Sequence, residues 1–192
     1  MFRGLGRLAG LGFVLTLAAL PGAGTAWGQE APFRWSEGMG RGQVLEVQGI
    51  SGEIRAVLAS GGQAEVVATK RGDDDDFGEV AIEVARDGDR VILCAVYGSE
   101  NHGQDRCAPG RGSRDRENRE GRRSRSINVS VDYEVRVPAG VEFNGTMVSG
   151  EILAEGLRSD VSATTVSGAV TVSTTGKAWA TSVSGDLDIR MG

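Results

Sequence analysis

Alternating apolar and polar residues predict β-strands along most of this chain. The clearest case is residues 127–137, where six apolar side chains alternate with five polar ones without interruption. A period of two is typical of a strand with one buried and one solvated face. Shorter β-prone runs at residues 44–47, 49–54 and 64–69 predict further strands. The chain is therefore expected to be all-β.

A β-hairpin is predicted within residues 80–96. Two apolar runs, residues 80–84 and 91–96, flank the sequence Asp87-Gly88-Asp89. An Asp-Gly pair between two such runs is a strong signal for a tight hairpin turn. We expect these two strands to pair antiparallel.

The C-terminal part of the chain repeats one motif. The pattern Thr-x-Val-Ser-Gly-x-aliphatic begins at Thr146, Thr164 and Thr181, with offsets of 18 and 17 residues. A degenerate copy, Ser-Gly-Glu-Ile, stands at residues 51–54. This spacing indicates a stack of strand-turn units, in which the glycine of each Ser-Gly step forms a turn by positive φ or close backbone approach. The predicted turn glycines are Gly52, Gly150, Gly168 and Gly185.

Stacking in register would place equivalent residues directly over one another. We expect two inward ladders to form the repeat core: Val148, Val166 and Val183 in the first, and Ile152, Val170 and Leu187 in the second. An antiparallel meander would have turns at similar intervals and stays open as an alternative. The recurrence of residue identity favours a β-solenoid-like stack of 17–18-residue repeats. An open edge of such a stack would favour self-association unless something covered it.

Residues 1–26 are predicted to be a signal peptide. A basic start with Arg3 and Arg7 precedes an apolar run over residues 8–20, and small residues follow at 24–26. This run is too short to cross a bilayer, which needs roughly 20 residues. We therefore expect export to the periplasm or the cell surface, and no transmembrane segment in the mature chain.

Charge argues against nucleic acid as a partner. Without Arg3 and Arg7 the mature chain has 19 basic and 26 acidic residues, a net charge of −7. Residues 98–126 contain eight arginines but also interleaved acids and no apolar periodicity, which predicts a disordered Arg-rich loop insertion. Residues 27–42 are rich in glycine and are predicted to form a flexible segment before the main domain, residues 43–192. Phe33 and Trp35 could pack on that domain as a cap.

The only two cysteines, Cys94 and Cys107, are expected to form a disulfide in an oxidising compartment. A zinc site that combines them with His102 is less favoured, because the ligand spacing is irregular. The acidic run at residues 73–76 could bind calcium but lacks the spacing of a known calcium loop. No metal or cofactor is expected.

No catalytic residue is predicted either. The chain has no Gly-x-Ser-x-Gly motif, and the carboxylates of the repeats are scattered rather than clustered: Glu151, Asp160, Asp186 and Asp188. The serines and threonines of the repeats are better interpreted as turn and ladder residues. The protein is therefore expected not to be an enzyme.

Several stretches together resemble a known family. They are the sequence VVATK at residues 66–70, ILCAVY at 92–97, VRVPAGV at 135–141 and the repeated Val-Ser-Gly. Over residues 43–192 the chain resembles the bacterial putative-adhesin family of β-strand-repeat proteins, a domain of unknown function in exported or envelope-associated proteins. The resemblance implies a right-handed β-solenoid-like fold and no established catalytic residues.

These expectations combine into one functional hypothesis. The protein is expected to be exported and non-catalytic, with a structural or adhesive role at the bacterial cell envelope and an envelope polysaccharide or protein as its partner. Two alternatives stay open: a self-assembling envelope scaffold that grows coil on coil, and a carbohydrate-active β-helix enzyme.

Overall fold

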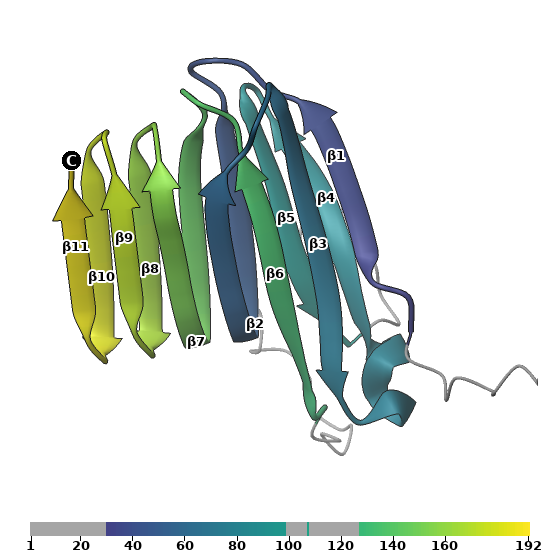
Figure 1. Cartoon of the computed structure of the whole chain (residues 1–192). Coiled ribbons are helices and arrows are strands. Elements are labelled where there is room, and N and C mark those ends of the chain that lie inside the picture. Colours follow the sequence, from purple (N-terminus) through teal and green to yellow (C-terminus); the bar gives the residue numbers. More distant parts are fainter. Residues whose placement is uncertain (1–29, 99–106, 108–126) are drawn as a thin grey trace, which may run out of the picture.

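The computed structural model describes residues 30–98, 107 and 127–192, and over these ranges the protein is all-β (Figure 1). The predicted signal peptide lies outside the described residues, as does the predicted loop insertion apart from Gly98 and Cys107. Within the described ranges no helix is long and apolar enough to span a membrane. The elements are β1 (Phe33–Gly38), β2 (Val44–Leu58), β3 (Gln63–Gly72), the 3-10 helix η1 (Asp74–Glu79), β4 (Val80–Asp87), β5 (Arg90–Tyr97), β6 (Val129–Val137), β7 (Glu142–Leu157), β8 (Val161–Ser167), β9 (Val170–Thr174), β10 (Ala178–Ser184) and β11 (Leu187–Met191).

Two long bent strands, β2 and β7, form the centre of the molecule. They pair in parallel from Val44 opposite Glu142 to Val57 opposite Glu155. Their first halves continue sideways into β5 on one side and into β8 and β10 on the other. Their second halves continue into β6 and into β9 and β11. The backbone turns sharply at Gly52 within β2 and at Gly150 within β7. Two layers of parallel strands therefore face each other across one hydrophobic core (Figure 1).

The N-terminal end of the molecule is antiparallel. Strand β4 pairs with β5 as the predicted hairpin, with Asp87 opposite Arg90 and a positive φ of 58° at Gly88. In the other layer β6 pairs antiparallel with β3. The predicted alternation of β6 is confirmed, because every second side chain from Val129 to Val137 is buried.

The stretch expected to be a flexible segment, residues 27–42, contains a strand instead. Strand β1 pairs antiparallel with β3 along its whole length. Phe33 and Trp35 point to the same side and pack partly buried against the core, as a cap would. The prediction of flexibility was wrong here because Pro32 and Gly38 lie at the ends of this alternating run and do not interrupt it.

The predicted disulfide between Cys94 and Cys107 is confirmed, with their Cα atoms 5.8 Å apart. Strand β5 is buried on both faces. Val91, Leu93 and Ala95 belong to the main core. The side chains between them join Cys107 in a second buried cluster: Ile92, Cys94 and Val96. Cys107 therefore lies on the outer side of the hairpin.

Candidate interaction surface

The Ser-Gly steps form a ladder of sharp corners. Gly52, Gly150, Gly168 and Gly185 have φ values of 130°, 145°, 139° and 150°. A Cβ added to Gly150 would lie 1.8 Å from the carbonyl oxygen of Gly52, and one added to Gly168 would lie 2.0 Å from that of Gly150. Backbone therefore contacts backbone at each corner, and no L side chain fits there.

Hydroxyl groups on the inner side support these corners. The Thr165 hydroxyl donates to the carbonyl of Gly150 at 3.2 Å, and the Ser182 hydroxyl donates to the carbonyl of Gly168 at 3.1 Å. Both residues occupy the x position of the Thr-x-Val motif, where the first copy has the buried Met147. Sequence reasoning missed this position because its identity changes from copy to copy.

The first predicted core ladder lies on the outside of the protein. Val148, Val166 and Val183 have exposed fractions of 38%, 49% and 78%. The side chains before the corner that point inward are those of Met147, Thr165 and Ser182, five residues ahead of the next inward position. In an uninterrupted strand, two residues on the same side are separated by an even number of positions. The corner therefore shifts the alternation of inward and outward side chains by one residue.

The second predicted ladder faces the core, but its last residue is exposed. Ile152 and Val170 are fully buried, and Leu187 is 48% exposed. Their register is direct, since Ile152 lies opposite Val170 and Val170 opposite Leu187. The row is thus a true inward ladder whose last member is left uncovered.

An exposed strip of threonine and valine side chains crosses three strands. Thr146, Thr164 and Thr181 are paired in register across β7, β8 and β10. The three exposed valines follow two residues further along each strand and point to the same side. We call these six residues the threonine–valine strip. Thr164 and Thr181 are exposed, and Thr146 is half-buried.

Strands β10 and β11 form an open edge of the stack (Figure 1). Within the described residues β10 pairs only with β8 and β11 only with β9. The inward side chains of β11 are exposed by 48%, 44% and 71%: Leu187, Ile189 and Met191. Their neighbours in β9 are buried, and within the described residues no strand pairs with the other side of β11.

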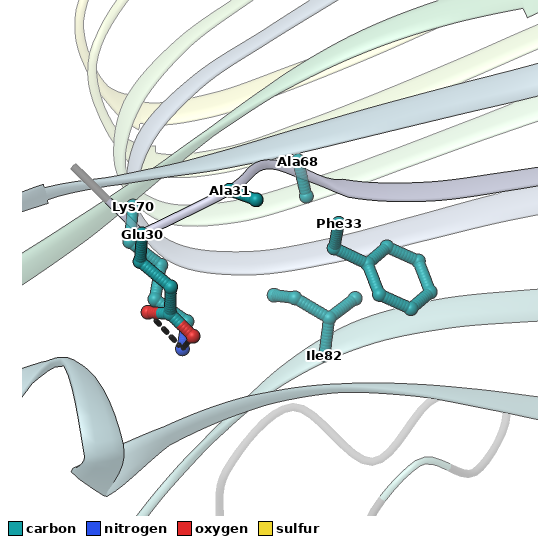
Figure 2. A pocket seen from close by; sticks show the side chains of 6 residues that line it. All are labelled: Glu30, Ala31, Phe33, Ala68, Lys70 and Ile82. Atoms are coloured by element: carbon teal, nitrogen blue, oxygen red, sulfur yellow. Dashed lines mark hydrogen bonds and ion pairs between the residues drawn. The ribbon is translucent and has the colours of Figure 1, made fainter. Parts of the chain in front are cut away.

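A small pocket lies near the opposite end of the stack (Figure 2). It has a volume of ≈ 250 Å³ and is lined by Glu30, Ala31, Phe33, Ala68, Lys70 and Ile82. The Lys70 ammonium lies 3.0 Å from a carboxylate oxygen of Glu30 and donates to the carbonyl of Phe77 at 2.9 Å. The two charged side chains of the pocket are thus paired with each other, and the other residues that line it are apolar.

The acidic run at residues 73–76 has a local structural role. The Asp73 side chain accepts from the backbone N–H of Asp75 and caps η1. Asp76 is buried, and its carboxylate accepts from the backbone N–H of Asn128 at 3.2 Å. Among the described residues no group of three or more His, Cys, Asp or Glu side chains is placed to hold a metal ion. His102 lies outside the described residues.

Both tyrosines are structural rather than reactive. The Tyr97 hydroxyl donates to the carbonyl of Val129 at 3.1 Å, and the Tyr133 hydroxyl donates to that of Gln48 at 3.4 Å. Burial raises the pKa of Tyr97 to about 12. Burial, with a smaller effect of Tyr97, raises the pKa of Tyr133 even further above its usual range.

No protein-family model matches this chain, and no curated protein matches it. A comparison with solved structures finds the crystal structure of a putative cell adhesion protein from Clostridium sporogenes ATCC 15579. The match has 7% sequence identity and a TM-score of 0.38, and it covers 84% of this chain and 100% of that one. Similarity at this level carries no argument about function.

Proposed function

We propose that this protein is an exported, non-catalytic β-repeat protein with a structural or adhesive role at the bacterial cell envelope. The observation that carries this proposal is the threonine–valine strip. It is a largely exposed surface that the repeat itself generates, since each copy of Thr-x-Val contributes one hydroxyl group and one aliphatic side chain.

The strand pairing supports a β-solenoid-like stack of 17–18-residue repeats. Copies of the motif lie side by side in parallel register, Thr146 with Thr164 and Thr164 with Thr181. A meander would pair them antiparallel. The parallel register therefore favours the stacked arrangement, with one coil added for each copy.

The chemistry of the strip suits a hydroxyl-rich ligand. Neighbouring strands lie about 4.8 Å apart, so the threonine hydroxyls form a regular row that can both donate and accept hydrogen bonds. The adjacent valine row provides apolar contact. We infer that the partner is an envelope polysaccharide, whose sugar rings present hydroxyl groups and apolar faces together.

Export is supported by the disulfide. Cys94 and Cys107 are linked, and such bonds persist in oxidising compartments. The predicted signal peptide would direct the chain there.

The absence of catalysis is proposed from the chemistry of the strip and of the pocket. The strip offers hydroxyl and aliphatic groups. On the adjacent strand β2, Gln48 lies opposite Thr146, and the Glu46 carboxylate two residues before it accepts hydrogen bonds from Gln48 and Arg90, an arrangement that does not activate a hydroxyl nucleophile. The pocket offers an ion pair, Glu30 with Lys70. Incubation with peptidoglycan and other polysaccharides should release no soluble sugar. Release above that of the heat-denatured protein would instead support the alternative of a carbohydrate-active enzyme.

Co-sedimentation with purified peptidoglycan sacculi tests the adhesive role. The double variant Thr164→Glu/Val166→Glu places two charges on the strip and should weaken binding by roughly tenfold or more. The matched control is Thr171→Glu/Ser173→Glu, which makes the same change on the outer side of β9 in the other layer. It should bind as the wild type does. Wild-type protein that stays in the supernatant, or equal losses in both variants, would contradict the proposal.

A self-assembling scaffold is the second candidate, and the open edge of β10 and β11 favours it. Open-ended, concentration-dependent assemblies in sedimentation would support the scaffold, whereas an assembly that closes at two copies would oppose it.

A further inference from the structure

Strand β11 is complementary to itself. Its sequence is Leu-Asp-Ile-Arg-Met, with the apolar side chains of Leu187, Ile189 and Met191 on the inner side and Asp188 and Arg190 on the outer side. If two copies of β11 pair antiparallel about Ile189, Asp188 of each lies opposite Arg190 of the other. Leu187 then lies opposite Met191, and the two Ile189 side chains meet at the centre.

Strand β10 has the same property about Thr181. An antiparallel pair centred there places Trp179 of each copy opposite Val183 of the other. These two side chains are exposed by 53% and 78% in the single chain. Aromatic and β-branched residues form favourable cross-strand pairs, so this contact would cover two of the most exposed apolar side chains of the described residues.

Both centres fit a single two-fold axis. Thr181 precedes the corner glycine, Gly185, by four residues, and Ile189 follows it by four. Because β10 runs toward the corner and β11 runs away from it, the two centres lie at the same distance from the corner in the two layers. One axis perpendicular to both layers can therefore pass through both.

We propose that two copies of this chain associate through the open edge, β10 with β10 and β11 with β11, in antiparallel pairs about one two-fold axis. The pairing supplies backbone hydrogen bonds to both unpaired edges and covers the row of Leu187, Ile189 and Met191. It joins the cores of the two stacks end to end.

This assembly closes at two copies. A two-fold contact uses the same surface on both partners and leaves nothing to extend. Growth coil on coil would instead need the opposite end of the stack to accept a parallel strand. That end consists of the antiparallel strands β1 and β4, which are joined by an ion pair between Glu37 and Arg86.

Charge reversal on β11 tests the pairing in the mature chain by sedimentation velocity. The wild type should show a monomer–dimer equilibrium. Asp188→Arg gives β11 two positive charges, and Arg190→Asp gives it two negative charges. Like charges then face each other across the axis in each variant alone, and the dimer dissociation constant should rise by roughly tenfold or more.

An equimolar mixture of the two variants should restore the dimer, because a positive strand then faces a negative one. This rescue separates a lost contact from a misfolded protein. The matched control is Arg55→Asp, which reverses one charge of the exposed ion pair between Arg55 and Glu53 on the central strand β2. It should dimerise like the wild type.

A wild type that is monomeric at every accessible concentration would overturn the proposal. So would open-ended assemblies, single variants that associate as the wild type does, or a mixture that stays monomeric. The strip variants of the sacculus assay do not alter β10 or β11, so failure of the adhesive role would leave this test unaffected.

Discussion

The carbonyl oxygen of Gly150 occupies the space where a side chain on Gly168 would begin, since a Cβ there would lie 2.0 Å away. Gly168 also has a φ of 139°, which L side chains rarely adopt. Any substitution must therefore push the backbone at Gly168 away from that at Gly150.

Gly168→Ala should lower the free energy of unfolding by about 3 kcal/mol or more, because it combines a backbone clash with a strained φ. Urea unfolding measures this. The adjacent Ser167 is exposed, and Ser167→Ala should change the free energy of unfolding by less than about 0.5 kcal/mol. Similar losses in both variants would mean that the coils do not contact each other at the glycine.

Thr165→Val should lower the free energy of unfolding by about 1–2 kcal/mol. The substitution keeps the shape of the side chain but removes the hydroxyl that donates to Gly150. The neighbouring Thr164 is exposed on the strip, and Thr164→Val is the matched control with little expected change. A neutral Thr165→Val would show that the corner carbonyl does not need this donor.

Val170→Thr and Val166→Thr should differ although the chemical change is the same. Val170 is fully buried, so a hydroxyl group there should cost about 1–3 kcal/mol of unfolding free energy. Val166 is 49% exposed, and its substitution should cost little. Chemical denaturation of both variants provides the comparison. A larger loss of unfolding free energy for Val166→Thr than for Val170→Thr would instead indicate that Val166 faces the core, as the motif predicted.

Alkaline pH should weaken the fold through its two tyrosines. Burial raises the pKa of Tyr97 to about 12, whereas an unfolded tyrosine ionises near about pH 10. The unfolded state therefore loses its protons first, and stability that is present below about pH 10 falls as the pH rises toward 12. Tyr133 acts in the same direction because burial raises its pKa as well.

Absorbance at the tyrosinate band checks this behaviour, because the sequence contains only these two tyrosines. In urea, both tyrosines should ionise near about pH 10. In the folded protein, this ionisation should be absent at that pH. Tyr97→Phe should reduce the loss of stability above that pH. Normal titration of both tyrosines in the folded state would contradict their burial.

The features of the fold that depend on local sequence signals could be predicted, and those that depend on how distant residues meet could not. The alternation of residues 127–137 and the Asp-Gly turn predict β6 and the β4–β5 hairpin correctly, because both signals are local. The side on which Val148 lies is not local. It depends on how the chain turns at Gly150, and Met147 and Val148 are both apolar and adjacent.

The candidate surface was therefore only partly predictable. The Thr-x-Val motif indicates that equivalent residues align, but not that its named residues face solvent while the variable x position faces the core. Strand β1 was missed for a different reason, since its two aromatic residues lie between Pro32 and a series of glycines that begins at Gly38. The open edge became visible only with Leu187, Ile189 and Met191 in register with a buried neighbouring strand.

Methyl NMR tests the central claim most directly, which is that the repeats stack in parallel with one row inside and one strip outside. Contacts between the methyl groups of Ile152 and Val170 should be observed, and a soluble paramagnetic agent should broaden the signals of Val166 strongly and those of Val170 hardly at all. Equal broadening of the two valines, or the absence of the contact between Ile152 and Val170, would contradict the account.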